Sequence, residues 1–355
     1  MRRLLQTRRR RAPSIQPQDD IALSCRIRLA RNLEGVKFPD WNDEAGHFHV
    51  IETIAQAVRD VGGLDGPVLI GGRDHAPDPQ VMAALHEEHV VSADLLNRGA
   101  GGALIRCADT GVSIMLNEED HLRIQVIRSG MGLLAAWQTA DQLDTRLETR
   151  LNYAFSNALG YLTACPSNVG TGLRASVMVN LLGLRLMEDL DPAMRALNAL
   201  RLTVRGVGGE GTEAAGHLFQ ISNQGTLGQR EEQVIDTLLS QVEELVRQEH
   251  LARLRLLRDA PVVLEDCVAR ALALLQSARM IPSDEALDYL SALRLGVQLK
   301  LLRNLGVARI DELMLACQPV HLQMRLHVDD SDPDARDARR ADWLRQELES
   351  VSLTV

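Results

Sequence analysis

Apolar and polar positions alternate along several short stretches in the first two thirds of the chain. In residues 21–28, Ile, Leu, Cys and Ile occupy every second position, which predicts a strand with one buried face. Two apolar runs, Ala103–Cys107 and Val112–Leu116, flank the turn residues 109–111, and this pattern predicts a hairpin. Further short strands are expected at 160–165, 202–204 and 217–224, while 175–186 fits a strand or a helix.

Helical spacing dominates the rest of the chain. Apolar residues recur every three to four positions in 133–153 and in 231–258, which predicts two amphipathic helices. Beyond Asp259-Ala260-Pro261 the pattern becomes entirely helical, with helices expected at 262–280 and, from an N-cap at Ser283, through residue 302.

These elements predict an α+β protein with an antiparallel sheet flanked by helices and a C-terminal all-helical domain. We expect a basic disordered arm at 1–20, a catalytic domain at 21–258 and a helical domain at 259–355. The arm is positively charged but contains no apolar core segment, so it does not resemble a secretory signal.

Composition limits the possible classes. The net charge is -9 and 45% of the residues are hydrophobic, which argues against a generally nucleic-acid-binding surface. No apolar stretch is long enough to predict a membrane span. The five cysteines are widely spaced without a CxxC motif, so we expect no disulfide framework, no zinc site and a reducing cytoplasm. Of the 39 basic residues 37 are arginine, so isolated arginine motifs are weak evidence.

The segment NEEDHLR (117–123) follows an apolar strand and places charges of both signs together. If the strand continued, Glu119 and His121 would point one way and Asp120 the other. Carboxylates at a strand end often line a cleft, and the alternative is a solvated loop with local ion pairs.

Three other segments carry candidate chemistry. In SCRIRLAR (24–31), Arg26 and Arg28 share one strand face, where two guanidinium groups suit phosphate oxygens, although chance also produces such pairs. Cys165 precedes a proline and a glycine loop, so it is either a reactive thiolate or a small buried hydrophobe. The glycine-rich segment 205–213 contains Glu210, which is either solvated or brought to a site when the loop closes. This segment matches neither a Rossmann fingerprint nor a P-loop.

Several arginines together with two or three carboxylates need counter-charges. The phosphates of ATP with Mg²⁺ would neutralise the arginines, and a guanidinium substrate would neutralise the glutamates. Such a site positions a phosphoryl acceptor, and a carboxylate removes a proton from a guanidinium whose pKa exceeds about 12. Phosphoryl transfer otherwise depends on positioning and charge stabilisation.

Four segments, in this order and spacing, resemble the ATP:guanidino phosphotransferases, which include the creatine and arginine kinases. The segments are SCRIRLARN, NEEDHLRIQ, YLTACPSNVGTGLRASVM and RGVGGEGTEAAG with QISNQGTLG, and the resemblance runs from about residue 21 to residue 258. Within this family, the chain looks most similar to the bacterial protein-arginine kinases. The resemblance implies an antiparallel sheet flanked by helices, ATP and Mg²⁺ as cofactors, and no metal ligands from the protein.

The resemblance also implies roles for particular residues. Glu119 would hold and deprotonate the guanidinium, Glu210 would be its partner on the closing loop, and Cys165 would lie beside the guanidinium. The phosphate-binding arginines would be Arg26, Arg28, Arg123, Arg174 and Arg205. The nucleotide-binding residues would be Ser24, Cys25, Arg26, Ile27 and Arg28; Arg174, Ala175, Ser176, Val177 and Met178; Arg205, Gly206, Val207, Gly208, Gly209 and Glu210; and His89 near the adenosine. Cys25 stands where serine is usual in the family.

Two features favour a protein substrate. Small-molecule members carry a helical domain before the first arginine motif, which here begins at Ser24. The C-terminal region resembles an extension that dimerises and carries a phosphoarginine-binding RDxxRA motif. That motif would be Arg336, Asp337, Ala338, Arg339, Arg340 and Ala341, and a solvated helix face is the alternative.

The expected function is therefore ATP-dependent phosphorylation of protein arginines in the stress response, by an allosterically regulated cytoplasmic homodimer. A small zinc-containing activator protein, a heat-shock repressor and a Clp-type unfoldase are expected partners by family analogy. The alternatives are a kinase of free arginine or another small guanidine, and a phosphoarginine-reading adaptor.

Overall fold

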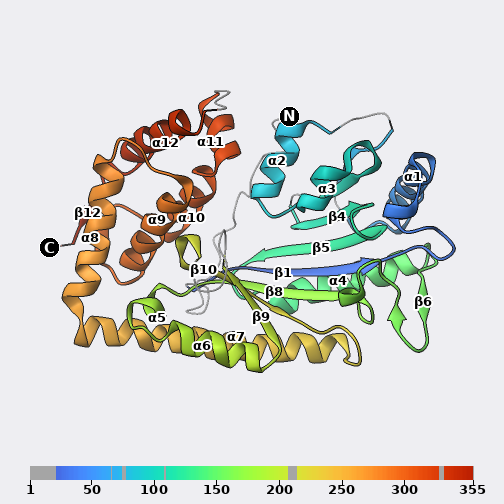
Figure 1. Cartoon of the computed structure of the whole chain (residues 1–355), viewed down its shortest axis with the longest axis horizontal. Helices are drawn as coiled ribbons and strands as arrows, with labels where there is room; N and C mark the ends of the chain where they lie inside the picture. The colour runs from blue at the N-terminus through green and yellow to red at the C-terminus, as the bar shows by residue number, and fades with distance from the viewer. Residues whose placement is uncertain are drawn as a thin grey trace. The chain divides into compact units, whose positions relative to one another are not determined.

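The computed structural model describes residues 21–64, 66–73, 77–107, 109–206, 214–327 and 332–354 (Figure 1). Within these ranges, eight strands form one sheet in the order β2-β3-β4-β5-β1-β8-β10-β9. The pairings among β2, β3, β4, β5 and β1 are antiparallel. The strands are β1 (Ala22–Arg31), β2 (Val68–Gly71), β3 (Ala103–Cys107), β4 (Val112–Leu116), β5 (Leu122–Ser129), β8 (Leu173–Asn180), β9 (Leu202–Gly206) and β10 (Leu218–Asn223).

Two short antiparallel pairs and a set of helices complete the described chain. The short pairs are β6 (Phe155–Ser156) with β7 (Gly160–Tyr161), and β11 (Leu302–Arg303) with β12 (Ser352–Leu353). The α-helices are α1 (Glu44–Val61), α2 (Pro79–Glu87), α3 (Ala93–Arg98), α4 (Leu133–Glu148), α5 (Leu182–Leu186), α6 (Leu190–Ala199), α7 (Glu231–Asp259), α8 (Pro261–Ser277), α9 (Ser283–Gln298), α10 (Val307–Ala316), α11 (Pro319–Leu326) and α12 (Pro333–Glu347). The 3₁₀ turns are η2 (Pro39–Trp41), η3 (Gly99–Gly101), η4 (Pro166–Asn168) and η5 (Ala215–His217).

The described residues divide into two compact units. One comprises residues up to Val177 together with Ser222–Gln241, and the other comprises Met178–Ile221 with Val242–Val355. The first unit contains β1 to β5 in full, with the arginine and NEEDHLR segments. The second is mainly helical and contains α8 to α12.

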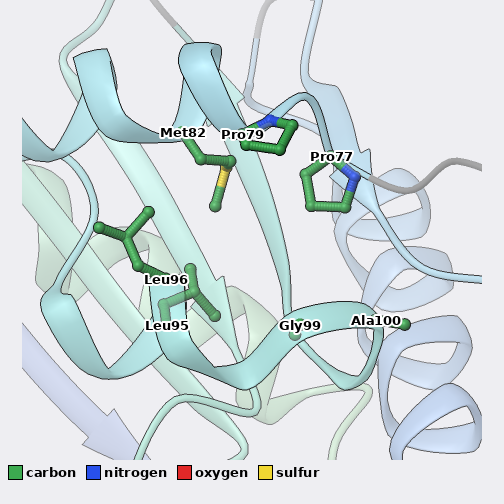
Figure 2. A pocket seen from close by; sticks show the side chains of 8 residues that line it. Pro77, Pro79, Met82, Leu95, Leu96, Gly99 and Ala100 are labelled. Carbon is green, nitrogen blue, oxygen red and sulfur yellow. The ribbon is translucent and has the colours of Figure 1, made fainter. Parts of the chain in front are cut away.

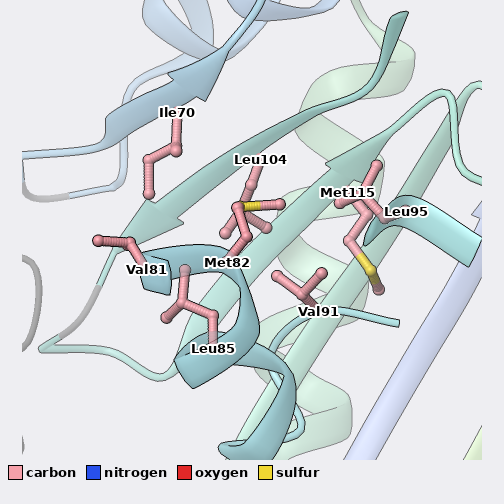
Figure 3. Close-up of a cluster of buried hydrophobic side chains, with 8 residues drawn as sticks. All are labelled: Ile70, Val81, Met82, Leu85, Val91, Leu95, Leu104 and Met115. Atoms are coloured by element: carbon pink, nitrogen blue, oxygen red, sulfur yellow. The ribbon is translucent and has the colours of Figure 1, made fainter. Parts of the chain in front are cut away.

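One face of the β2–β5 strands packs against α2 and α3. Leu104 lies opposite Met115 on β3 and β4, and Met115 lies opposite Arg123 on β5. This face therefore begins as an apolar core and continues into a charged region. The core comprises Ile70, Val81, Met82, Leu85, Val91, Leu95, Leu104 and Met115 (Figure 3).

The opposite face of β1 and β5 packs against α4. Cys25, Ile27 and Leu29 are buried there, because alternation along β1 directs every second side chain to that face. The buried positions of α4, including Leu133, Trp137, Ala140, Leu143 and Leu147, recur at helical spacing. Packing against α4 on this side leaves the partly exposed Arg26 and Arg28 on the other face of β1.

The predicted fold class is confirmed, and several elements agree closely with their predicted bounds. The hairpin strands are Ala103–Cys107 and Val112–Leu116, as expected. Gly111 has a φ of +70°, and a Cβ there would meet the Ile127 carbonyl, so this turn requires glycine. The ambiguous segment 175–186 contains both alternatives, since β8 ends at Asn180 and α5 follows.

Several element predictions are wrong in detail. The helix expected at 133–153 ends at Glu148. The strand expected at 160–165 ends at Tyr161, because Ala164 N–H donates to the Asp120 carboxylate instead of to a neighbouring strand. The helix expected through 302 ends at Gln298, and Lys300 with a φ of +61° leaves the helical conformation. Ser283 is the first helical residue, and Pro282 occupies the N-cap position.

No helix in the described ranges is both long and apolar enough to span a membrane. All five cysteines are free thiols, with Cys25, Cys107 and Cys317 buried. The domain boundary near Asp259 stays a prediction.

Candidate active site

Three arginines lie on the charged face of the sheet in the first unit. Arg26 and Arg28 alternate along β1, and Arg28 lies opposite Gln125 in the β1–β5 register. Arg123 lies opposite Ala30, so its side chain projects from the same face. Arg174 on β8 is close enough to influence the protonation of both Arg26 and Arg28. The four arginines therefore form one cluster from three adjacent strands.

Burial and mutual repulsion lower the pKa values of arginines in this cluster. Burial, followed by the charges of Arg123 and Arg174, lowers the pKa of Arg26 to about 10. Burial, reinforced by the neighbouring arginines, lowers the pKa of Arg28 well below its ordinary value against a small opposing effect of Glu118. The Arg28 Nε is buried and has no hydrogen-bond partner among the described residues. A polyanion such as a triphosphate would supply an acceptor for the Arg28 Nε and negative charge beside the cluster.

Glu118 partly neutralises the cluster through an ion pair with Arg123. Burial acts to raise the pKa of Glu118, but Arg123 and hydrogen bonds from Ser92 and the Glu119 backbone outweigh burial and lower it. Glu118 is 0% exposed, so its position is set by the protein rather than by solvent. No role was predicted for Glu118. Glu118 and Arg123 are five residues apart and separated by a tight loop. That spacing matches neither the period of a helix nor that of a strand, so the sequence did not predict their ion pair.

Glu119 occupies a different environment from its neighbour. It is half-buried, and burial followed by the negative charges of Glu118, Asp120 and Asp94 raises its pKa, while Arg123 opposes the shift. Because a raised pKa makes a carboxylate a stronger base, Glu119 is suited to accept a proton from a bound cation.

The predicted alternation of Glu119, Asp120 and His121 is wrong. Strand β4 ends at Leu116, and Asn117 adopts a left-handed φ of 53° that starts a bend before β5. Asp120 and His121 are buried at 2% and 0% exposure. The solvated-loop alternative is therefore also wrong for these two residues, because the loop is held inside by specific hydrogen bonds.

Asp120 joins the Glu119 loop to the Cys165 segment. Its Oδ1 accepts from Asn32 Nδ2 at 2.6 Å and from the Ala164 backbone N–H at 2.7 Å. Ala164 is the residue before Cys165, and Asp120 is the residue after Glu119. The Asp120 carboxylate therefore joins the segment that carries Cys165 to the loop that carries Glu119. Burial raises the pKa of Asp120 although both hydrogen bonds act to lower it.

Cys165 is half-buried at the start of η4. Its Sγ lies 3.0 Å from the Ser167 hydroxyl, and its carbonyl accepts from the Thr163 hydroxyl at 2.8 Å. Of its two predicted environments, the structure therefore favours the partly accessible one.

His89 lies in the connection between α2 and α3, above the charged face. Its carbonyl accepts from Gln125 Nε2 at 3.1 Å, and Gln125 lies opposite Arg28. Desolvation, followed by the positive charges of Arg26 and His86, lowers the pKa of His89 to about 4, although the residue as a whole remains exposed. A neutral imidazole beside the arginines fits the predicted place near a nucleotide base.

The other predicted nucleotide residues fall into three groups. Cys25, Ile27, Ala175 and Val177 are buried, so their contribution is to set the strands that carry the arginines. Ser24, Ser176 and Met178 alternate with them on β1 and β8. Arg205 and Gly206 end β9 in the second unit, while Val207, Gly208, Gly209 and Glu210 lie outside the described residues. These assignments stay predictions.

The predicted phosphoarginine-binding motif lies on α12, where its arginines differ in exposure. Arg340 is 1% exposed, and it donates to the carbonyls of Cys317 and Ile281 at 2.7 Å each and pairs with Asp337. Arg339 is exposed and Arg336 is half-buried. The solvated-face alternative therefore fails for Arg340, whose guanidinium fastens α12 to the segments before α9 and after α10.

Replacing Arg340 with alanine is expected to lower the unfolding free energy by about 3 kcal/mol, because Asp337 and two carbonyls lose their buried partner. The Arg270→Ala variant is the matched control. The Arg270 side chain on α8 is 74% exposed, and its ion pair with Asp266 is long, at 3.9 Å, so its loss should change stability little. Urea unfolding of both variants measures the difference, and equal losses would contradict the structural role of Arg340.

An apolar pocket of about 280 Å³ lies between α2 and α3 (Figure 2). Because its lining is almost entirely apolar, it does not suit a triphosphate. In the described part of the chain no group of three or more His, Cys, Asp or Glu could hold a metal ion. The pocket is lined by Pro77, Pro79, Met82, Leu95, Leu96, Gly99, Ala100 and Gly102.

The described geometry thus combines an arginine-lined face with a half-buried carboxylate, Glu119, and a half-buried thiol, Cys165. The arginines lie on neighbouring strands, and the loop between β4 and β5 contacts Arg123 through Glu118 and the residue before Cys165 through Asp120. The arrangement is suited to hold a phosphoryl donor on the arginines and a cationic acceptor at Glu119.

Comparisons with known proteins agree with this geometry. A family model described as "ATP:guanido phosphotransferase, C-terminal catalytic domain" matches residues 74–252. A second model, "Protein-arginine kinase McsB C-terminal domain", matches residues 261–354. Lombricine kinase has a similar structure, with a TM-score of 0.55 and 26% identity over 67% of this chain and 69% of that chain. The taurocyamine kinase of Schistosoma mansoni aligns with a TM-score of 0.60 at 22% identity, covering 75% of this chain and 40% of its own, and so supports the fold alone.

The curated relatives are more similar in sequence. The protein-arginine kinase of Pelotomaculum thermopropionicum is 42% identical over 94% of both chains. That of Bacillus subtilis is 41% identical, covering 94% of this chain and 91% of its own.

The fold and the arginine-lined site define an enzyme of the ATP:guanido phosphotransferase class. Within that class, the chain belongs to the protein-arginine kinase family, because its similarity to those relatives extends through both the catalytic and the C-terminal regions.

Replacing Asp120 with alanine is expected to lower kcat by about 10–100-fold, because Glu119 and the Cys165 segment lose their common tether and small misplacements are costly. Asp120→Asn should retain most activity, since an amide oxygen can still accept both hydrogen bonds. Steady-state kinetics of this pair, with thermal unfolding as a check on folding, separates tethering from charge. A loss in Asp120→Asn equal to that in Asp120→Ala would mean that the charge itself is required.

Proposed function

We propose that this protein transfers the γ-phosphoryl group of MgATP to the guanidinium of arginine residues in proteins. The observation that carries this proposal is the loop between β4 and β5. Directly after this loop, Arg123 on β5 belongs to the arginine cluster, and within the loop Glu119 is followed by Asp120, which accepts from the Ala164 N–H of the Cys165 segment. One short loop thus connects a phosphate-binding surface with a base suited to a guanidinium.

The arginine cluster would hold the nucleotide phosphates, and the orphaned Arg28 Nε supports this role. Arg205 and residues 206–210 would complete the nucleotide site by analogy with the family. Mg²⁺ would bind mainly through the phosphate oxygens and water, as this ion commonly does when a protein lacks a dedicated cage. It would compensate the negative charge that develops during transfer.

At the acceptor side, Glu119 would clamp the guanidinium and remove a proton from its attacking nitrogen. Its raised pKa reduces the mismatch with a guanidinium whose own pKa exceeds about 12. Cys165 would contact the same guanidinium, and Glu210 would be a second clamp. Exclusion of water as a loop closes over the site would favour transfer to nitrogen over hydrolysis.

A protein substrate is favoured over a free guanidine because the chain matches the C-terminal domain that is named for the protein-arginine kinase. The relatives named as protein-arginine kinases also align along 94% of this chain. The small-guanidine kinase remains the alternative for the shared catalytic domain. A phosphoarginine-reading adaptor is less well supported, because Glu119 and the arginine cluster retain the chemistry of transfer.

The proposal also includes a cytoplasmic homodimer that acts in the stress response and is regulated through residues 336–341. A zinc-containing activator, a heat-shock repressor and a Clp-type unfoldase are the partners that family analogy suggests.

The direct test is to incubate the protein with MgATP and a denatured, arginine-containing protein, and to map acid-labile phosphate on arginine. Free arginine serves as the competing acceptor in a parallel reaction. Phosphate on protein arginines, with little transfer to free arginine, is the expected result. Transfer only to free arginine would support the small-guanidine alternative, and transfer to neither would contradict the proposed activity.

A further inference from the structure

The segment Leu33–Trp41 is fastened directly to the acceptor loop. His121 Nδ1 accepts from the Leu33 backbone N–H at 3.0 Å, and His121 Nε2 donates to the Lys37 carbonyl at 2.7 Å. Burial, reinforced by His47, lowers the pKa of His121 against the effect of the Lys37 bond, so the imidazole keeps the neutral form that these two bonds require. His121 is two residues from Glu119, which ties the position of this segment to the proposed base.

Arg98 provides a second attachment. Its guanidinium donates to the Glu118 carbonyl at 2.5 Å and pairs with the Asp40 carboxylate at 2.7 Å. One side chain therefore links the residue before Glu119 with the residue before Trp41. These attachments, at Lys37 and at Asp40, tie the segment that leads into Trp41 to the loop that carries Glu119.

Trp41 is 81% exposed, whereas Trp137 and Trp343 are buried at 8% and 6%. Leaving a whole indole in water forgoes the stabilisation that its burial would give. Exposed tryptophans that are held rigidly are typical of binding surfaces, because the ring offers a large contact area with few rotatable bonds.

A second exposed apolar group lies on a segment that is tied to the same loop. Phe155 and Leu159 are 56% and 47% exposed on the β6–β7 hairpin. Asn32 accepts from Ala154 N–H through its carbonyl at 2.8 Å and donates from its side chain to Leu162 O at 3.0 Å. The same amide donates to Asp120, so Asn32 connects the hairpin with the acceptor loop.

The charge of the segments next to Trp41 indicates which partner fits. Glu34, Asp43 and Glu44 are exposed there, Asp40 is paired with Arg98, and Lys37 is the exposed lysine of the segment. This acidic surface attracts an arginine-bearing polypeptide and repels nucleic acid. A free amino acid is too small to fill the acceptor site and also cover an indole outside it, whereas a polypeptide continues on both sides of its arginine.

We infer that Trp41, with Phe155 and Leu159, forms a docking surface for the polypeptide that flanks the target arginine. This inference rests on the proposed transfer to protein arginines. The preference for a polypeptide over a small guanidine would then come from these exposed apolar side chains and the acidic residues near them. None of them takes part in the proposed chemistry.

The test compares wild-type protein with Trp41→Ala, using a tryptophan-free peptide with one central arginine. The variant should raise the KM for the peptide about tenfold, with kcat and the KM for ATP unchanged, as expected for loss of one well-placed contact. Leu134→Ala, which removes a side chain 49% exposed on α4, is the matched control and should have no effect. The double variant Glu34→Gln/Glu44→Gln should raise the peptide KM more at low salt than at high salt. The control is Glu52→Gln/Asp60→Asn, which removes two exposed charges farther along α1 and should not change the peptide KM.

Binding is also measured without catalysis. Among the described tryptophans only Trp41 is exposed, so the peptide should reduce acrylamide quenching of the wild-type fluorescence, and a lysine-substituted peptide should do so less.

If wild-type protein phosphorylates the peptide while Trp41→Ala keeps its KM, the docking inference is wrong and the proposed function stands. If wild-type protein transfers no phosphate to arginine, the proposed function fails, and absent protection from quenching then overturns the docking surface as well. Quenching that depends on protein concentration but not on peptide would instead assign this surface to a second copy and also overturn the inference.

Discussion

Replacing Glu119 with glutamine is expected to lower kcat by about 10²–10⁴-fold, the usual contribution of a positioned general base. ATP affinity should stay within about twofold of wild type, because the arginine cluster remains intact. Glutamine preserves the size of the side chain but cannot accept the guanidinium proton. Single-turnover phosphorylation and calorimetric titration of ATP measure the two effects separately.

The pH dependence gives a sharper version of this test. Burial and the charges of Glu118, Asp120 and Asp94 raise the pKa of Glu119, so kcat/KM should fall as pH drops through a value above that of an ordinary glutamate. Asp94→Asn removes one of these charges, and it should shift the acid limb to lower pH while retaining activity. An unchanged acid limb in Glu119→Gln would show that another group titrates there.

The stability of Glu119→Gln has a predicted sign. A carboxyl whose folded-state pKa is raised stabilises the fold most at low pH, and this contribution is lost as pH rises through the folded-state value. At neutral pH ionised Glu119 therefore disfavours folding slightly, and the neutral amide should leave Tm equal or slightly higher. Loss of activity together with a lower Tm would indicate misfolding instead of loss of the base.

The second large effect is expected from Arg28→Met, which should lower kcat/KM by about 10³-fold, in the range associated with loss of a phosphate-stabilising arginine. The same substitution should raise Tm, because methionine fills similar space and removes a charge crowded by Arg26, Arg123 and Arg174. The result would be a protein that is more stable and almost inactive, a combination typical of functional sites.

Arg31→Met on the same strand is the control, because Arg31 projects to the opposite face. Its guanidinium is 1% exposed, pairs with Asp144 at 2.6 Å and lies 3.5 Å from the Tyr161 ring centroid. Breaking this buried pair should cost about 3–5 kcal/mol of stability. Thermal unfolding and ATP titration of both variants provide the comparison. A lower Tm in Arg28→Met would mean that the cluster is already compensated without a ligand.

Local patterns were sufficient for much of the sheet. The bounds of β3 and β4 follow from two apolar runs around Gly111, and the shared face of Arg26 and Arg28 follows from the two-residue period of a strand. The helices α4 and α7 also begin where their apolar spacing begins, at Leu133 and Glu231. These features depend on neighbours within a few positions, which a single sequence displays directly.

The acceptor site depended on the family resemblance, because no local pattern separates Glu119 from Glu118. The structure distinguishes them by environment, since Glu118 is buried and pairs with Arg123, whereas Glu119 is half-buried and burial raises its pKa. Similarly, the sequence of residues 336–341 does not predict which of its arginines is buried. That choice follows from carbonyls at Ile281 and Cys317, which are distant in the chain.

The strands, the long helices and the face on which Arg26 and Arg28 lie follow from short-range periodicity, so they can be predicted from the amino-acid order alone. Packing between distant segments is needed for Asp120 to join Asn32 to Ala164, for His121 and Arg98 to hold the Trp41 segment, and for Arg340 to be buried. Each of these contacts joins a polar group to a partner whose place is set by the packing of other elements. A buried polar group needs a hydrogen-bond partner, but the local sequence does not specify which distant residue will supply it.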